Sequence, residues 1–90
     1  MTSTTEAIRD ARASVDIDKH GTDWIVRHID GASIYEGPSM DYHRARGECR
    51  RARIEHALIA LGWDDMAAEQ AAYVSDPTGR WEDVVRGSSQ

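Results

Sequence analysis

The stretch DWIVRHIDGASIYEG, residues 23 to 37, limits most strongly which folds this chain can adopt. Two runs of β-branched and aromatic residues flank Asp30-Gly31, a pair that favours a type I′ hairpin turn because glycine takes a positive φ freely and aspartate tolerates it. With this pair at the centre of the turn, Ile29 faces Ala32 across the strands. One face then carries Ile25, Ile29, Ala32 and Ile34, and the other carries Trp24, Val26 and Tyr35. Because both faces hold large apolar groups, we expect a β-hairpin that is covered on more than one side or that uses one face for binding.

A long helix is predicted to follow the hairpin. Ser39 or Asp41 can cap this helix at its start, and Gly62 can end it after Leu61. Apolar side chains recur along it at 3-4-3 spacing, at Tyr42, Ala45, Cys49, Ala52, His56 and Ile59, and Ile54, Leu58 and Leu61 widen the stripe. Gly47 lies inside the helix at a cost of about 1 kcal/mol relative to alanine, so it indicates either a close approach of another backbone or a kink.

The N-terminal segment allows two structures. Thr5 can cap a helix over residues 6–14, but Val15 and Ile17 alternate with polar residues as in a strand. The choice between helix and strand therefore stays open for residues 5–19. A strand here would extend the hairpin to a three-stranded antiparallel sheet.

The C-terminal segment predicts a second, shorter helix over residues 64–74, because paired aspartates suit the positive end of a helix. Residues 76–79 are predicted to form a turn, and residues 81–86 a short helix or a final strand. The chain is thus predicted to be a single domain, residues 1–90, of the α+β class, with the hairpin or three-stranded sheet packed on the long helix. Its polar ends, residues 1–4 and 87–90, are expected to be disordered tails.

Composition narrows the class of protein. Cys49 is the only cysteine, so no disulfide can form within the chain, as is usual in a reducing compartment. The N-terminal sequence MTSTTEAIRD has neither the basic run nor the apolar core of a signal peptide. No apolar run approaches the roughly 20 residues that span a bilayer. We therefore expect a cytoplasmic protein that does not enter a membrane.

Charge is divided unevenly along the chain. The formal net charge is −5, yet the stretch HRARGECRRAR, residues 43–53, holds five arginines and one glutamate, which gives it +4 and leaves −9 for the remainder. His43, Arg46, Arg50 and Arg53 recur at 3-4-3 spacing and so line one side of the long helix. This line is interpreted either as a face paired with acidic groups elsewhere in the fold or as a docking strip for phosphate or for an acidic protein surface.

The two remaining arginines of the stretch have local acidic partners. Arg44 precedes Glu48 by four residues and Arg51 precedes Glu55 by four, so surface i,i+4 ion pairs are predicted.

No other pattern predicts a metal site or a catalytic centre. Asp16, Asp18, His20 and Gly21 resemble the start of a calcium-binding EF-hand loop, but the position of its essential glutamate is taken by Arg27. Histidine and cysteine do not recur at zinc-site spacing, and Cys49 and His56 fall on the apolar stripe. A glycine-rich phosphate loop, a nucleophile elbow and an HExxH motif are all missing. We therefore expect a protein that is not an enzyme and needs no cofactor or metal.

The stretch ALGWDDMAAEQAAYVSDPTGRWEDVVRG, residues 60–87, resembles the helix-turn-helix region of small phage and bacterial repressors. The shared features are Leu61-Gly62-Trp63, Val74-Ser75, Thr78 and Arg80-Trp81-Glu82. This resemblance implies a small DNA-binding regulator that uses residues 60–87 or the arginine-rich helix. Pro77 and Gly79 would weaken the recognition helix, and phosphates would repel its acidic surface, so direct nucleic-acid binding is kept as the alternative.

In size, acidity and lack of catalytic motifs the chain resembles the small phage-encoded inhibitors of host defence, including anti-CRISPR proteins. That resemblance implies stoichiometric binding, as a monomer or homodimer, to a protein complex that handles nucleic acid, such as a CRISPR effector in the host cytoplasm. An acidic surface can mimic DNA in front of a cationic channel. The residues expected to form this surface around the hairpin are Asp16, Asp18, Asp23, Asp30 and Glu36, with the arginine line as a second contact. Trp24, Tyr35 and Trp81 are expected to be either aromatic anchors of the interface or core residues.

Overall fold

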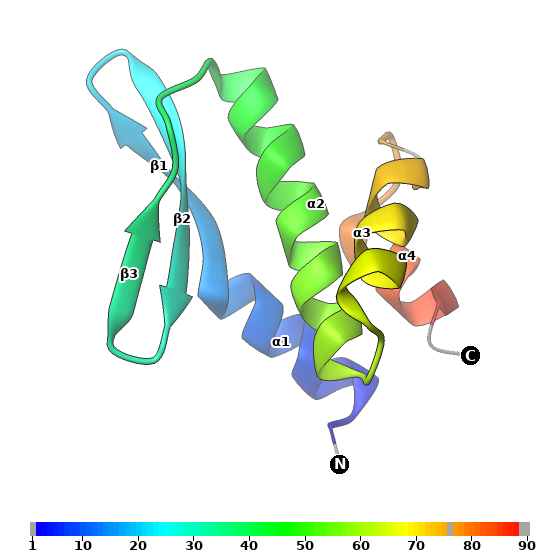
Figure 1. Ribbon diagram of the computed structural model, residues 1–90. Helices are drawn as coiled ribbons and strands as arrows, with labels where there is room; N and C mark the ends of the chain where they lie inside the picture. The colour runs from blue at the N-terminus through cyan, green and yellow to red at the C-terminus, as the bar shows by residue number, and fades with distance from the viewer. Residues whose placement is uncertain (1, 76, 89–90) are drawn as a thin grey trace.

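A computed structural model describes residues 2–75 and 77–88 and confirms the α+β class. The elements follow one another along the chain as α1 (Thr4–Ser14), β1 (Val15–His20), β2 (Asp23–Asp30), β3 (Ser33–Glu36), α2 (Tyr42–Ala60), α3 (Asp65–Val74) and α4 (Trp81–Ser88). The three strands form an antiparallel sheet in the order β1-β2-β3. Helix α2 lies against this sheet on one side and against the other helices on the other side, so it is the central layer of the molecule (Figure 1).

The N-terminal segment contains both structures that the sequence left open. Helix α1 passes directly into β1 at Val15, and its cap is Ser3, whose Oγ accepts a hydrogen bond from the Glu6 backbone N–H, in place of the predicted Thr5. The expectation of disordered ends is wrong for Thr4, which belongs to α1, and for residues 87–88, which belong to α4. The outermost parts of the predicted tails, residues 1 and 89–90, lie outside the described residues.

Both hairpin turns use glycine at the first of two central positions. Gly21 has φ +67° and Gly31 has φ +60°, while no described non-glycine residue has a positive φ. This is the requirement of a type II′ turn, which needs a positive φ only at its first central residue. Asp30 therefore stays in the extended region as the last residue of β2, and the predicted Asp30-Gly31 turn centre is wrong by one position.

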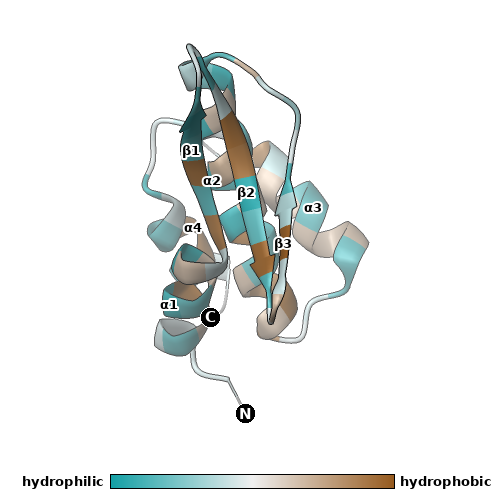
Figure 2. Cartoon of the chain, turned by 90° about the vertical axis from the view of Figure 1, so that its left-hand side faces the viewer, coloured by the Kyte–Doolittle hydropathy of each residue, from teal (hydrophilic) through white to brown (hydrophobic). Residues whose placement is uncertain are grey.

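The register between β2 and β3 differs accordingly from the predicted one. Ile29 pairs with Ile34 and not with Ala32. This displacement amounts to two residues of the partner strand, and side chains alternate between faces with a period of two, so the predicted faces survive the error. Val15 and Val26 face α2, whereas Ile34 lies on the opposite face and is 61% exposed. Figure 2 shows this outer face of the sheet in front of the helices.

Helix α2 begins and ends close to the predicted positions. The Asp41 carboxylate accepts a hydrogen bond from the Arg44 backbone N–H at 2.9 Å, and Gly62 follows the helix end with φ +101°. Local signals of this kind act within one turn and need no tertiary partner, which is why the sequence predicts them well.

The core divides into two clusters that meet at α2. The N-terminal half of α2 contributes Ala45 and Cys49 to a cluster with the sheet. Its C-terminal half contributes Ile54, Ala57 and Leu58 to a larger cluster with the other three helices. Because the two halves bury different sides, the single predicted stripe is wrong at its ends, where Tyr42 is 40% and Ile59 is 43% exposed.

The C-terminal helices both pack on α2 and share its core cluster, but among the described residues no Cα atom of one lies within 8 Å of a Cα atom of the other. Helix α3 begins at Asp65, one residue later than predicted, because Asp64 is its cap, and residues 81–88 form a helix, not a strand. Residues 77–79 form the predicted turn, while Asp76 lies outside the described residues. In a helix-turn-helix the two consecutive helices pack directly on each other, so this arrangement departs from the repressor motif. None of the helices in the described parts of the chain is long and apolar enough to cross a bilayer.

Candidate functional site

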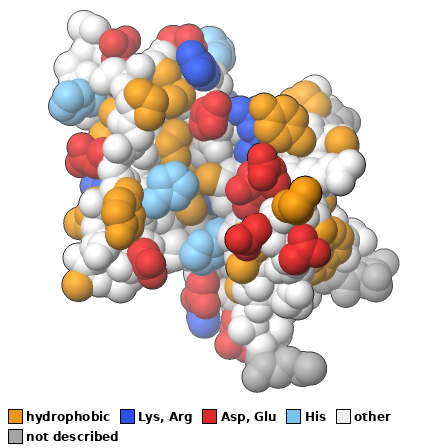
Figure 3. Space-filling model, viewed as in Figure 1, with side chains coloured by type: hydrophobic (Ala, Val, Ile, Leu, Met, Phe, Trp, Pro, Cys, Tyr) orange, Lys and Arg blue, Asp and Glu red, His pale blue; other side chains and the backbone are white. Residues whose placement is uncertain are grey.

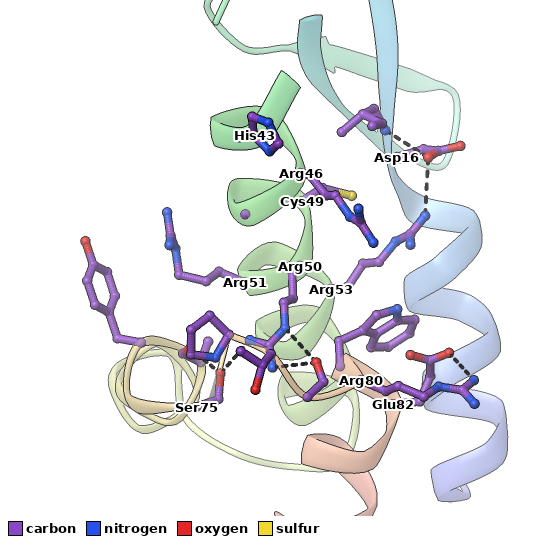
Figure 4. Close-up of a pocket in the computed structure, with 18 of the residues that line it drawn as sticks. Asp16, His43, Arg46, Cys49, Arg50, Arg51, Arg53, Ser75, Arg80 and Glu82 are labelled. Carbon is purple, nitrogen blue, oxygen red and sulfur yellow. Dashed lines mark hydrogen bonds and ion pairs between the residues drawn. The ribbon is translucent and has the colours of Figure 1, made fainter. Parts of the chain in front are cut away.

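An open groove of about 1040 Å³ lies between α2, β1, the end of α3 and residues 75 and 77–82 (Figure 4). Its described lining holds five arginines, which are Arg46, Arg50, Arg51, Arg53 and Arg80. The carboxylates in this lining are those of Asp16 and Glu82. Guanidinium groups thus outnumber carboxylates here, within a chain that is acidic as a whole. We call this feature the arginine groove, and its walls come from three parts of the chain that are distant in sequence.

Arg53 is held in place by the sheet. Its Nε donates to the backbone carbonyl of Val15 at 2.7 Å, and its Nη2 lies 3.3 Å from a carboxylate oxygen of Asp16. The side chain is only 19% exposed. Of the two interpretations of the arginine line, Arg53 fits the one in which an arginine pairs with an acidic group of the fold. Its counter-ion is Asp16, which is predicted above to be part of an acidic contact surface.

Arg50 connects α2 to the segment between α3 and α4. Its Nη1 donates to the Ser75 hydroxyl at 2.7 Å, and its Nε and Nη2 lie 3.3 and 3.2 Å from the Gly79 carbonyl. Such a set of bonds fixes the guanidinium and at the same time holds the opposite wall of the groove. Arg50 is thus a structural bridge as well as a lining residue.

Arg46 and His43 are the two members of the predicted line that remain exposed. Arg46 makes no hydrogen bond or ion pair with any described residue. Figure 4 shows its side chain extending from α2 to the same side on which Arg53 reaches Asp16. Gly47, next to Arg46, also lines the groove, and a Cβ atom built there would meet nothing within 4 Å. The structure therefore rules out the predicted close backbone approach at Gly47 and leaves open space beside an unpartnered cation.

The predicted surface ion pairs are wrong in their partners. Arg51 lies 3.0 Å from Glu48, three residues before it, and does not form the expected pair with Glu55. Its guanidinium also stands 5.2 Å from the ring centre of Tyr73 on α3, which is 70% exposed. Arg51 and Tyr73 form the rim of the groove on the α3 side.

The wall opposite α2 contains residues whose role the sequence did not indicate. Glu82 is buried and accepts hydrogen bonds from Arg12 at 3.0 Å and from Arg80 at 3.1 Å. The Trp81 ring contacts two guanidiniums, because those of Arg12 and Arg53 are each 5.6 Å from its centre. Trp81 is thus a core residue held by cation–π contacts, and not an exposed anchor. The sequence signal for this wall is Arg80-Trp81-Glu82. The resemblance to repressors assigns these three residues to a helix-turn-helix instead.

The pKa of Glu82 reflects these contacts. Burial alone would raise it, but a hydrogen bond from its own backbone N–H and those from Arg80 and Arg12 outweigh burial and hold the pKa below its usual value. Glu82 also raises the pKa of Arg80 through their hydrogen bond. Glu82 is therefore charged at neutral pH and neutralises part of this wall.

The acidic residues predicted as one contact surface are not gathered by the fold. Asp16 is engaged by Arg53, and Asp18 lies 3.2 Å from Arg27 across the β1–β2 pair. Asp23 and Asp30 are exposed at opposite ends of β2, which are roughly 23 Å apart at about 3.3 Å per residue. Alternation along the strand also puts these two on opposite faces. Glu36 is exposed on β3. The fold therefore spreads these carboxylates over both faces and both ends of the hairpin and does not gather them into one patch.

Cys49 lines the arginine groove but is buried behind its surface. Its Sγ lies 3.9 Å from the Val15 carbonyl. Burial raises the pKa of the thiol, an effect that Arg53 reduces and Asp16 adds to. A protonated, buried thiol is a poor nucleophile, so Cys49 acts as a small core residue.

A second, smaller hollow of about 360 Å³ lies between the sheet, α2 and α3. Glu48, Glu55 and Glu69 line it, and acidic side chains gather over this part of the face shown in Figure 3. Burial, followed by the charges of Glu69 and Glu48, raises the pKa of Glu55, although Arg51 opposes this. Across residues 2–75 and 77–88, no three His, Cys, Asp or Glu side chains are grouped as metal ligands. The molecule thus carries a cationic groove and an acidic hollow on either side of Arg51 and Tyr73.

Comparison of the chain with protein-family models, with curated proteins and with solved structures gives no match.

Proposed function

We propose that this chain is a non-enzymatic protein-binding module that docks a partner through the arginine groove. The observation that carries the proposal is Arg46, an exposed guanidinium without a described partner on the wall of a groove in which Arg50 and Arg53 are fixed by hydrogen bonds. Guanidinium groups bind carboxylates and phosphates through paired hydrogen bonds, and a rigid arrangement loses little entropy on binding. An anionic group on a partner would complete the coordination of Arg46.

Binding fits the groove better than chemistry does. The one thiol that lines it is buried, with a raised pKa, and Glu82 is already engaged by two arginines. General acid–base or nucleophilic catalysis needs a group that can exchange protons with a ligand near neutral pH. The arginines and Glu82 of this groove hold charge in place, and His43, the imidazole in its described lining, has no thiol or hydroxyl bonded to it that it could activate.

The most specific form of the proposal is a small inhibitor of a protein complex that handles nucleic acid, such as a CRISPR effector. Its support is the resemblance in size, acidity and lack of catalytic motifs. A DNA-like acidic surface is not part of it, because Asp23 and Asp30 lie at opposite ends of β2. The arginine groove is the docking surface, and occlusion of the partner's nucleic-acid site follows from the bulk of the bound domain.

Inhibition of a panel of purified CRISPR effector complexes tests this form. DNA cleavage is measured at increasing ratios of the protein, with Arg46→Glu as the groove variant and Arg44→Glu as its matched control. Both substitutions reverse one exposed charge on α2, but Arg44 does not line the groove. We expect inhibition that saturates near a one-to-one ratio, is lost in Arg46→Glu and is kept in Arg44→Glu. A panel without any inhibited complex contradicts the inhibitor, and equal inhibition by both variants contradicts the groove as its docking surface.

Direct nucleic-acid binding is the competing outcome. Binding of labelled duplex DNA and RNA is measured at about 50 and about 200 mM salt, because affinity that comes from phosphate contacts falls steeply over this range. Tight, salt-sensitive binding that Arg46→Glu removes would contradict a protein partner.

A further inference from the structure

We infer that the arginine groove accepts a short acidic segment of a protein, with an apolar side chain among its carboxylates. This inference deepens the proposed protein-binding function and rests on it. It identifies the chemistry of the partner segment from what lines the groove and what surrounds it.

The cations of the groove are positioned for more than one carboxylate. Arg46 lies along the same side of α2 as Arg53, whose Nη2 already has Asp16 as its counter-ion at 3.3 Å. Arg80, on the opposite wall, is held by Glu82 but keeps 72% of its side chain exposed. Arg46 and Arg80 can therefore each bind an external carboxylate, while the half-buried Arg50 and Arg53 keep the walls in place. Two anchoring points on opposite walls suit an extended ligand better than a single small anion.

The rim of the groove also offers apolar surface. Tyr73 is 70% exposed and Tyr42 is 40% exposed, and both line the groove. Covering an exposed aromatic ring with an apolar side chain of a ligand stabilises the complex, because apolar surface of both groups is removed from water. A ligand made only of phosphates would leave these rings solvated, whereas a peptide with a leucine or phenylalanine among its acids would cover one of them.

The surroundings of the groove disfavour a nucleic acid. The carboxylates of Asp18 on β1 and Asp83 on α4 lie beyond Asp16 and Glu82, and each is paired with an arginine, Arg27 or Arg86, so the cationic surface does not continue past the groove on these two sides. A duplex carries a charge about every 1.7 Å along its axis and would extend over these carboxylates. A short peptide places a few charges inside the groove and can be neutral outside it.

Gly47 provides the space that such a segment needs. A Cβ atom there would meet nothing within 4 Å, so the side chain of a larger residue would begin in open space at a position that lines the groove. Gly47→Leu therefore blocks the groove and adds no charge. It also improves the helix propensity of α2, so loss of binding in this variant cannot be attributed to unfolding.

Fluorescence anisotropy with defined probes tests the inference. The probes are a labelled peptide in which aspartates and glutamates flank one leucine and one phenylalanine, the same peptide with asparagine and glutamine for its acids, and a labelled single-stranded oligonucleotide. We expect the acidic peptide to bind, and the amide peptide and the oligonucleotide to bind far more weakly. Affinity for the acidic peptide should fall roughly ten- to a hundredfold in Arg46→Gln, as for a lost charge-assisted hydrogen bond. It should be lost in Gly47→Leu and unchanged in the matched control Arg44→Gln.

Two results would overturn the inference. One is the lack of any binding of the acidic peptide, and the other is oligonucleotide binding as tight as that of the peptide. These are separable from failure of the proposed inhibition. Peptide binding that depends on Arg46, without inhibition of any effector complex, supports the inference and contradicts the inhibitor. Inhibition that depends on Arg46 without peptide binding overturns the inference and leaves the inhibitor standing.

Discussion

Glu82 shows how a single buried charge can organise the junction of α1 and α4. Its carboxylate receives Arg12 from α1 and Arg80 from the segment before α4, while its side chain is only 10% exposed. Both arginines keep more than half of their side chains exposed, so they stay hydrated on one side. The carboxylate is the partner that depends on these bonds, because it has lost most of its water.

This dependence predicts a pH-sensitive contribution to stability. The pKa of Glu82 is lowered in the folded state, so its stabilising effect is present above the usual glutamate pKa of about 4.3 and is lost as the pH falls through the lowered folded value. We expect Glu82→Gln to melt at a lower temperature than the wild type at neutral pH and to approach it as the pH falls through the lowered pKa of the folded state. Thermal unfolding followed by circular dichroism at several pH values measures this, with Asp83→Asn as an exposed control. A difference that is the same at every pH would contradict a role for the charge.

Residue roles within the arginine line could be predicted only in part. The 3-4-3 spacing correctly places four side chains along one side of α2, because helix geometry is local. Which of them are paired depends on partners far along the chain: Arg50 bonds Ser75, 25 residues away, and Arg53 bonds Val15, 38 residues away. No spacing rule contains that information, and Arg46 differs from its neighbours only in what the fold places opposite it.

At the scale of elements, local signals predict where helices begin and end, and tertiary contacts decide what they bury. Asp41 and Gly62 bound α2 as expected. The predicted apolar stripe assumes one partner along the whole helix, whereas α2 packs on the sheet with one half and on helices with the other. Ile59 is exposed for that reason. The predicted turn after β2 is wrong by one residue because both Asp30-Gly31 and Gly31-Ala32 suit a two-residue hairpin. A type I′ turn needs a positive φ at both central residues, whereas a type II′ turn needs it only at the first.

Gly47 offers a prediction about α2 itself. It has a helical backbone and open space at the Cβ position, so Gly47→Ala should stabilise the protein by about 0.5–1 kcal/mol through reduced entropy of the unfolded chain. For a domain of this size such a gain raises the melting temperature by about 4–8 °C per kcal/mol. Gly62→Ala is the opposite control, because φ +101° strains any residue with a Cβ. An unchanged or lower melting temperature for Gly47→Ala would show that this turn of α2 is not a regular helix in solution.

At the scale of the whole molecule, α2 is the only element shared by the two described core clusters. The sheet cluster contains Val26, and the helical cluster contains Leu58 and Val85, all nearly inaccessible to solvent. A small sheet with one face exposed is not expected to be stable without the helix that covers its other face. The groove has the same dependence, since its walls come from β1, α2, the end of α3 and residues 75 and 77–82. Folding of the sheet and completion of the groove should therefore both require the helical cluster.

The coupling between the clusters can be tested with Leu58→Ala. Leu58 is fully buried, so its truncation should cost about 2–5 kcal/mol of a total stability of about 5–15 kcal/mol. If α2 joins the clusters into one cooperative unit, amide hydrogen exchange should accelerate by the same factor at Val26 in the sheet and at Val85 in α4. Ile34→Ala, at a side chain that is 61% exposed, should change both rates little. Faster exchange at Val85 with an unchanged rate at Val26 would contradict this coupling. It would mean that the sheet and the first half of α2 fold as a separate unit. Local unfolding of the helical cluster would then remove one wall of the arginine groove and leave the others in place.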